Sequence, residues 1–145
     1  MFDIRCMEES DLEQVVTIEK SIFSDPWSKR SFLDSIVQEN CLFLVVCKEE
    51  EIVAYSGLYV VQDEGQITNV AVKESYRNAH IATDMMMELM RQAKAMGACN
   101  FTLEVRISNT TAIHLYEKLG FKSVGIRKRF YDKPVEDAMI MWLYN

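Results

Sequence analysis

The sequence predicts an α/β fold in which one mixed sheet of about seven strands carries helices on its flanks. Strand-like runs of apolar residues are interleaved with segments whose apolar residues recur every three or four positions, as in helices. One helical segment lies between two strand segments, which by the crossover rule makes those strands a parallel pair near the centre of the sheet. The short loops elsewhere predict antiparallel pairs.

The first half of the chain contains a short strand, two helices and three strands. Residues 2–7 form the first strand, and Ser10 with Glu13 makes a capping box that opens the first helix. Ser28 is expected to cap the second helix, whose apolar stripe includes Phe32. Three strands then follow over residues 41–48, 52–62 and 66–72.

The second half alternates helices and strands. A helix begins at Ile81 and ends near Gly97, and a strand with alternating apolar residues covers 101–106. The next helix spans 109–119, with Gly120 as its stop, and two strands close the chain over residues 121–127 and 136–145. Because no repeat or linker interrupts this order, we expect a single domain over residues 1–145.

Composition narrows the class of protein. A chain of 145 residues that is 49% hydrophobic can bury the core of one ordinary domain. A net charge of −6 argues against a nucleic-acid partner, which requires a basic face. No apolar run approaches the roughly 20 residues that cross a bilayer, so we expect no membrane partner and a cytoplasmic location.

The cysteines do not indicate a metal site. The chain has four cysteines, without a CxxC pair, and only two histidines. Neither a zinc site nor a disulfide framework is suggested, so no metal is expected. We expect all four thiols to be reduced and mostly buried.

Three groups of polar residues are expected to meet at one edge of the sheet. The loop 77–83 follows one parallel strand, Glu104 lies on the other, and Asn109 and Tyr116 belong to the helix after it. Ligands of open sheets collect at the carboxyl ends of parallel strands. A loop that opens a helix also offers free backbone N–H groups to a phosphate.

Residues 103–121, LEVRISNTTAIHLYEKLGF, resemble the signature of the GNAT superfamily of acyl-CoA-dependent N-acyltransferases, N-x-x-A-x-x-L-Y-x-x-x-G-F. The resemblance covers nearly the whole chain and is strongest to the bacterial ribosomal-protein-alanine N-acetyltransferases, through FSDPWS at 23–28, NVAV at 69–72 and EDAMIM at 136–141. It implies acetyl-CoA as co-substrate. The implied acceptor is the N-terminal α-amine of a protein, most simply a ribosomal protein.

The resemblance also implies a role for particular residues. Glu104 matches the general base and Tyr116 the acid that protonates the departing thiolate. Trp27 and Tyr131 match positions beside the acceptor, within segments 23–28 and 127–137 that frame the peptide groove, and Glu136 and Asp137 are weaker candidates for facing a basic peptide. The positions that match cofactor contacts are Val70, Ala71, Val72, Arg77, Asn78, Ala79, His80, Ile81, Ala82, Thr83 and Asn109.

Each assignment has a structural alternative. Glu104 occupies the polar phase of an alternating strand, which without the resemblance fits a solvated surface carboxylate better. Tyr116 fits a core aromatic residue whose hydroxyl reaches the surface. Asn109 fits an N-cap of its helix. A histidine at position 80 is also typical of a loop side chain that points to solvent.

His80 departs from the family pattern, Q/R-x-x-G-x-G/A, because it stands at a glycine position. A positive φ there would cost a histidine about 1 kcal/mol, and its Cβ would crowd the pyrophosphate. Backbone N–H groups remain, so we expect cofactor binding to persist in weakened form. Two other functions stay open: acetylation of a small amine or polyamine, and a catalytically silent GNAT-like binding protein.

Overall fold

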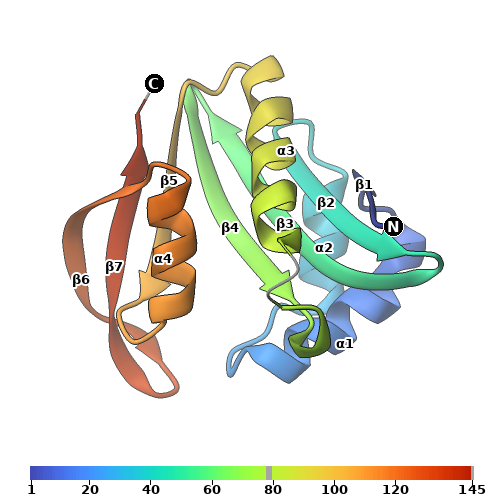
Figure 1. Cartoon of the computed structure of the whole chain (residues 1–145), viewed down its shortest axis with the longest axis horizontal. Coiled ribbons are helices and arrows are strands. Elements are labelled where there is room, and N and C mark those ends of the chain that lie inside the picture. Colours follow the sequence, from blue (N-terminus) through green and yellow to red (C-terminus); the bar gives the residue numbers. More distant parts are fainter. Residues whose placement is uncertain (78–79, 145) are drawn as a thin grey trace.

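The computed structural model describes residues 1–77 and 80–144, which build one mixed sheet (Figure 1). The strands lie in the order β1-β2-β3-β4-β5-β7-β6. In this described part, β4 and β5 are the one parallel pair. The fold class and its central parallel pair are therefore confirmed. The strands are β1 (Asp3–Cys6), β2 (Cys41–Lys48), β3 (Glu51–Val61), β4 (Glu64–Val72), β5 (Asn100–Arg106), β6 (Lys122–Asp132) and β7 (Val135–Leu143).

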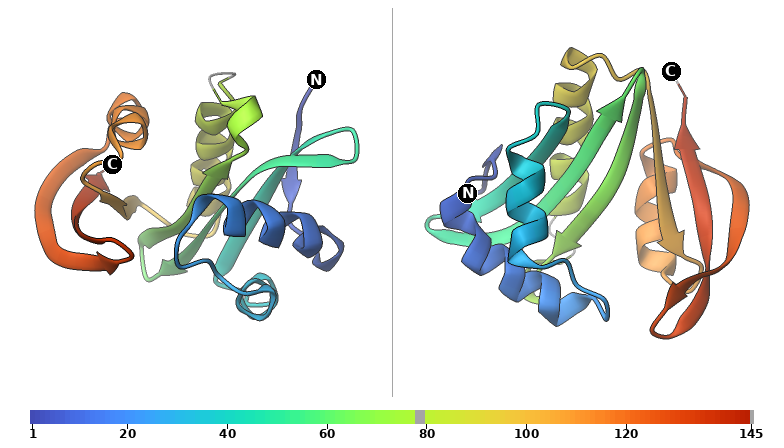
Figure 2. Two further views of the ribbon diagram at one scale, coloured as in Figure 1. Left: turned by 90° about the horizontal axis from the view of Figure 1, so that it is seen from below. Right: turned by 180° about the vertical axis from the view of Figure 1, so that it is seen from behind.

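Helices cover both faces of the sheet (Figure 2). On one face, α1 (Leu12–Ile22) and α2 (Lys29–Ile36) share an apolar cluster with Tyr55 of β3. On the other face, α3 (Ile81–Ala95) and α4 (Thr110–Lys118) share a cluster with Leu58 of the same strand. The two helical layers therefore lie on opposite faces of the sheet.

The helix ends largely follow the predicted signals. The Ser28 hydroxyl accepts the Ser31 amide at 3.1 Å at the start of α2. Gly97 and Gly120 follow α3 and α4 with φ of 105° and 103°, a left-handed conformation that costs glycine little. These three expectations are confirmed.

The start of α1 differs from the prediction. Ser10 lies inside a one-turn 3-10 helix, Glu9–Asp11, and α1 begins after it. The Asp11 carboxylate accepts the Glu8 amide at 2.7 Å and two hydrogen bonds of 2.8 Å from Arg5. The capping box is therefore formed by Glu8 and Asp11 at the start of the 3-10 helix rather than by Ser10 and Glu13, and Arg5 of β1 holds the Asp11 carboxylate in place.

Strand β6 extends beyond the predicted end at residue 127. Arg127 pairs with Ala138 and Tyr131 with Glu136, so three residues of β6 lie opposite one residue of β7. Arg129, inside this bulge, has a φ of 53°. A bulge of this kind bends a strand without ending it, which the residue pattern does not reveal.

The cysteines are less buried than expected. Cys47 is buried and Cys41 is half-buried, whereas Cys6 and Cys99 are exposed, and none of the four is in a disulfide. The expectation of reduced thiols fits this arrangement, but the expectation of mostly buried ones is wrong. The two exposed cysteines lie at strand ends, since Cys6 is the last residue of β1 and Cys99 immediately precedes β5.

Among the described residues, no helix is both long and apolar enough to cross a membrane.

Candidate active site

The two parallel strands are joined only at their beginnings. Their paired residues are Glu64 with Asn100, Gly65 with Phe101 and Gln66 with Thr102. Beyond these pairs β4 and β5 diverge, which Figures 1 and 2 show as a split through the sheet. The facing edges of both strands therefore lack a strand partner over their carboxyl-terminal halves, and a ligand can use those edges.

A bulge in β4 lies at the point where the split begins. Leu58 pairs with Ile67 and Gly57 pairs with Asn69, so Thr68 is the extra residue. Thr68 is exposed and lines the cleft, and its hydroxyl lies 2.7 Å from the Asn69 side-chain oxygen. Bulges re-aim side chains and main-chain groups next to active sites.

The last residues of β4 direct some of their main-chain groups towards the split. The Lys73 amide donates to the Val53 carbonyl at 2.8 Å, which makes these two residues a hydrogen-bonded pair with β3. Since such pairs alternate along an antiparallel ladder, Ala71 also faces β3, whereas Val70 and Val72 direct their N–H and C=O groups towards β5. Two of the three predicted strand contacts thus have amides available to a ligand.

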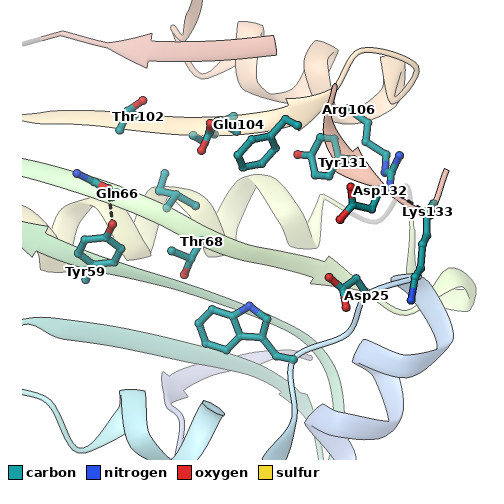
Figure 3. Close-up of a pocket in the computed structure, with 14 residues that line it drawn as sticks. Asp25, Tyr59, Gln66, Thr68, Thr102, Glu104, Arg106, Tyr131, Asp132 and Lys133 are labelled. Carbon is teal, nitrogen blue, oxygen red and sulfur yellow. Dashed lines mark hydrogen bonds between the residues drawn. The ribbon is translucent and has the colours of Figure 1, made fainter. Parts of the chain in front are cut away.

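A cleft of about 490 Å³ occupies the split on the face of α1 and α2 (Figure 3). Three parts of the chain form its walls: the α1–α2 loop, the diverging strands with β3, and the β6–β7 hairpin. The lining residues are Asp25, Trp27, Tyr59, Gln66, Ile67, Thr68, Thr102, Leu103, Glu104, Arg106, Phe130, Tyr131, Asp132 and Lys133. The structure thus brings together Trp27, Glu104 and Tyr131, three of the predicted residues.

Glu104 places a carboxylate in this cleft. It lies on β5 beyond the last residue paired with β4, and its side chain is 32% accessible to solvent. One oxygen, Oε2, lies 2.9 Å from Nη1 of Arg127 on β6. A carboxylate in this position can accept a proton from a group that enters the cleft, directly or through water.

The β6–β7 hairpin is fixed to β5 by Arg106. Its guanidinium donates to Glu136 at 3.0 Å and to the carbonyls of Lys133 and Pro134 at 3.2 and 2.9 Å. It also lies 4.3 Å from the ring centre of Tyr131. Burial raises the pKa of Tyr131, and the nearby Glu104 charge adds to this effect. Tyr131 is therefore a neutral, oriented wall of the cleft.

Glu136 and Asp137 serve the hairpin itself. Glu136 accepts the Ser108 amide at 2.7 Å as well as Arg106, and hydrogen bonds from Ser108 and then Arg106 lower the pKa of Glu136. Asp137 accepts the Arg129 amide at 2.9 Å, inside the bulge. Both carboxylates are engaged within the chain, so the suggestion that they face a basic peptide is not supported by their positions.

The predicted cofactor loop begins α3 with an unusual backbone. His80 is exposed and is the N-cap residue of α3, with φ 62° and ψ 12°, so the left-handed condition for a strained histidine is met. Its side chain makes no capping hydrogen bond. Arg77 donates from Nε to the Val72 carbonyl at 3.2 Å, which holds the loop against the end of β4.

The rest of this loop divides into inward and accessible positions. Ile81 is buried beneath α3, and Ala82 and Thr83 are half-buried. Asn78 and Ala79 lie outside the described residues. The His80 side chain does not cap the first turn of α3, so this turn can offer its backbone amides to a ligand. Together with the Val70 and Val72 amides, these positions fit an extended phosphorylated ligand.

Tyr116 and Asn109 lie on the opposite side of β5 from the cleft. Tyr116 is 6% exposed on α4, its ring centre is 5.9 Å from that of Phe121, and burial, with a smaller electrostatic contribution from the nearby Tyr131, raises its pKa. Asn109 Oδ1 accepts the Ala112 amide at 3.2 Å, which makes it the N-cap of α4. Neither lines the cleft, and both belong to the layer of α3 and α4.

Several cleft residues were not anticipated from the sequence. Thr68 enters through the β4 bulge, which leaves no pattern in the residues. Tyr59 and Gln66 meet through a hydrogen bond of 2.5 Å at the closed end of the split, although they lie on different strands. Phe130 and Asp25 belong to the two segments expected to frame the acceptor, so only their segments were predicted.

The architecture defines an enzyme class: a sheet split between parallel strands, with main-chain donors on one strand and a carboxylate on the other, suits transfer of a group from an extended donor. The family model for acetyltransferases of the GNAT family matches residues 12–121. The chain belongs to the GNAT acetyltransferase family and is an acetyltransferase by class.

Known relatives agree with this assignment. A Bacillus subtilis (strain 168) protein, provisionally named a ribosomal protein bS18-alanine N-acetyltransferase, is 37% identical over 97% of this chain and 93% of its own. The crystal structure of the ribosomal-protein-S18-alanine N-acetyltransferase from Escherichia coli matches with a TM-score of 0.90 and 32% identity, over 99% of this chain and 94% of that one. Arabidopsis thaliana NAA60 in complex with acetyl-CoA shares the fold, with a TM-score of 0.91 and 18% identity over 99% and 98%.

Proposed function

We propose that this chain transfers the acetyl group of acetyl-CoA to the N-terminal α-amine of a protein, and that a ribosomal protein is the acceptor. The observation that carries the proposal is the split between β4 and β5, because a cleft lies along it on the face of α1 and α2 and Glu104 lines this cleft. The relatives from Bacillus subtilis and Escherichia coli support the ribosomal acceptor.

The two substrates are proposed to enter from opposite faces. Acetyl-CoA supplies the thioester, and the amides of Val70, Val72 and the first turn of α3 would hold its pantetheine and diphosphate. The acceptor peptide enters the cleft between Trp27 and Tyr131 on the other face. The amine and the thioester carbonyl then meet within the split, next to Glu104.

Glu104 is assigned as the general base. Attack requires a neutral amine, and an α-amine has a reference pKa of about 7.7–8.0, against about 10.4 for lysine. The difference of roughly 2.5 units is about 3.4 kcal/mol, so one carboxylate suffices for an N-terminus and is a poorer base for a lysine side chain. The amine nitrogen bonds to the carbonyl carbon, its proton passes to Glu104, and the carbon–sulfur bond breaks.

Tyr116 is assigned as the acid for the departing thiolate. It belongs to α4, on the same face of the sheet as the proposed cofactor site. Burial raises the pKa of its hydroxyl, which keeps the proton in place at neutral pH. Asn109, the N-cap of the same helix, fixes the start of α4 and is proposed to contact the cofactor there.

The test is acetyl transfer to a peptide that has an N-terminal alanine and one internal lysine, with the modified atom located by mass spectrometry. We expect the α-amine to be acetylated and Glu104→Gln to lower kcat about 10²–10⁴-fold. Glu117→Gln, an exposed carboxylate of α4, is the matched control and should keep the parent rate. Equal rates for Glu104→Gln and the parent would remove Glu104 from the mechanism.

Acidic groups at the cleft favour a second candidate function, acetylation of a small amine or polyamine. Asp25, Glu104 and Asp132 all line the cleft, and Lys133 lies beside them (Figure 3). Negative side chains attract a polycation. Higher kcat/KM for spermidine than for any N-terminal peptide would favour this function over peptide acetylation.

A further inference from the structure

Glu19 of α1 is a buried carboxylate that the proposed chemistry does not use. Its residue is 2% exposed, Oε1 accepts the Tyr55 hydroxyl at 2.5 Å, and Oε2 accepts the Trp27 amide at 2.9 Å. Burial raises the pKa of this carboxyl, and the hydrogen bonds from Trp27 and Tyr55 act in the opposite direction. A buried acid is costly unless its partners are in place, so its position requires an explanation.

The acceptor side of the molecule supplies that explanation. Residues 24–27 connect α1 to α2 and contain Asp25 and Trp27, which line the cleft. Within the described part of the chain, the bond from the Trp27 amide to Glu19 is the one hydrogen bond made by these four residues. The Glu19 carbonyl also accepts the Phe23 amide at 3.0 Å, where α1 ends. Glu19 therefore holds the loop at its beginning and near its end.

The side chain of Trp27 is placed by the same contact. Its ring centre lies 5.2 Å from that of Phe32 and 6.0 Å from that of Phe43, and Trp27 also lines the cleft. Contacts with other aromatic rings resist sideways movement of the Trp27 ring. How far the ring lies from the core depends instead on the position of the Trp27 backbone. The bond between the Trp27 amide and Glu19 sets that distance.

We propose that Glu19 is a positioning residue for the acceptor, which sets the width of the peptide groove by drawing Trp27 towards the core. This inference rests on the proposed function, because it requires the cleft to hold the acceptor. A carboxylate suits the task since two donors, the Trp27 N–H and the Tyr55 O–H, converge on it. The two donors approach different oxygens, so in glutamine one of them would face the NH₂ group, which is itself a donor.

The first readout does not need activity. In a Trp142→Phe background, Trp27 is the remaining tryptophan, and acrylamide quenching of its fluorescence reports its exposure. We expect Glu19→Gln and Glu19→Ala to increase quenching, while Glu13→Gln on the same helix, 82% exposed at its side chain, leaves quenching unchanged. Unchanged quenching in both Glu19 variants would overturn the proposal.

The second readout separates positioning from general damage. Loss of about 1.4 kcal/mol of hydrogen bonding corresponds to a tenfold change, so we expect the KM for the peptide to rise about tenfold in Glu19→Ala, which removes the acceptor of the Trp27 amide. The KM for acetyl-CoA and kcat should stay within about twofold. Tyr55→Phe keeps the Trp27 bond and should retain the parent KM for peptide. A parallel rise of both KM values would overturn the proposal.

A third measurement uses the unmodified protein and does not depend on whether a variant folds. The Trp27 amide should exchange slowly with deuterium, although it lies in a loop, because Glu19 binds it. Exchange at the rate of an unprotected amide would contradict the proposal. If the parent protein shows slow Trp27 exchange but transfers no acetyl group, the proposed function fails and the anchoring of the loop stands.

Discussion

The first four strands of the sheet and the last three are packed differently. β2 and β3 are buried along almost their entire lengths, because helices cover both of their faces. β6 is exposed at nearly every position and has no strand on its outer side. Figure 1 shows the two parts as separate bodies that join where β4 meets β5.

This difference in packing indicates that the two parts contribute differently to the proposed site. The first part is a densely packed support that presents fixed main-chain amides along β4 and at the start of α3. The second part is a lightly covered hairpin and helix that contribute Glu104, Tyr131 and Tyr116. The seam between the two parts is the boundary of β4 and β5, and only three residue pairs join these strands. The rest of the seam remains open for ligands, and the substrates are proposed to meet there.

The largest expected effect is a difference in stability loss between two phenylalanine variants, one at the seam and one in the β6–β7 hairpin. Phe101 is fully buried, and Phe101→Ala should lower the free energy of unfolding by about 3–5 kcal/mol. Phe130 is 42% exposed, so Phe130→Ala should lower it by less than about 1 kcal/mol. Urea denaturation measures both. Similar losses would show that the two parts are equally packed.

The next effect concerns the ion pair between Arg5 and Asp11. Asp11→Asn should cost about 1.5–3 kcal/mol at neutral pH, because it removes charged hydrogen bonds to a buried carboxylate. The pair of Arg106 and Glu136 is its counterpart in the second part, and Glu136→Gln should cost less. Thermal unfolding of both variants tests the order, and a larger loss for Glu136→Gln would reverse the comparison.

The Asp11 pair also predicts a pH dependence. Burial alone would raise the pKa of Asp11, but hydrogen bonds from Arg5 and the Glu8 amide, with the charge of Arg5, outweigh it and lower that pKa. Because the folded-state pKa lies below the unfolded value of about 3.9, the stabilisation is complete above pH 3.9 and is lost as pH falls through the folded-state pKa. The difference in Tm between parent and Asp11→Asn should therefore shrink in acid. A constant difference would contradict this.

A smaller effect comes from a glycine at the seam. A Cβ on Gly65 would lie 2.7 Å from Cδ1 of Phe101, its partner across the parallel pair, so Gly65→Ala should cost about 1–3 kcal/mol. A Cβ on Gly125 of β6 meets no atom within 4 Å, and Gly125→Ala should change stability by no more than about 0.5 kcal/mol. Chemical denaturation distinguishes the two, and equal losses would mean that the seam tolerates added volume.

The smallest effect is expected at two residues whose backbone is in the left-handed region, one in each part of the sheet. His80 and Arg129 have φ of 62° and 53°, so His80→Gly and Arg129→Gly should each stabilise the protein by up to about 1 kcal/mol. Only His80→Gly should also tighten acetyl-CoA binding in calorimetry, because its Cβ lies at the proposed diphosphate site. No heat of binding for the parent, together with binding by His80→Gly, would favour the silent binding protein.

The fold was predictable because its elements carry local signals. The periodic apolar residues of α3, the stops at Gly97 and Gly120 and the N-cap at Ser28 all act within a few residues of where they occur. The capping box of Glu8 and Asp11 ahead of α1 was not predictable, because Arg5 from β1 holds Asp11 in place. Likewise the bulge that lengthens β6 leaves no residue pattern.

The candidate site was predictable only in part, for the same reason. Motif positions identified Glu104, Trp27 and Tyr131, which the structure places together in one cleft. The motif also identified Tyr116, but its burial on the far face depends on packing against Phe121. The other cleft residues come from the α1–α2 loop, β3, β4, β5 and the β6–β7 hairpin, so only the assembled sheet brings them together.

The most direct test of the account is residue-resolved hydrogen exchange along β4, with and without acetyl-CoA. In the free protein the Val70 and Val72 amides should exchange faster than that of Ala71, since they face the split. Saturating acetyl-CoA should slow Val70 and Val72 and leave β1 and β2 unchanged. Slow exchange of Val70 and Val72 in the free protein, or no change with acetyl-CoA, would contradict the claim that the split between the parallel strands is the acetyl-transfer site.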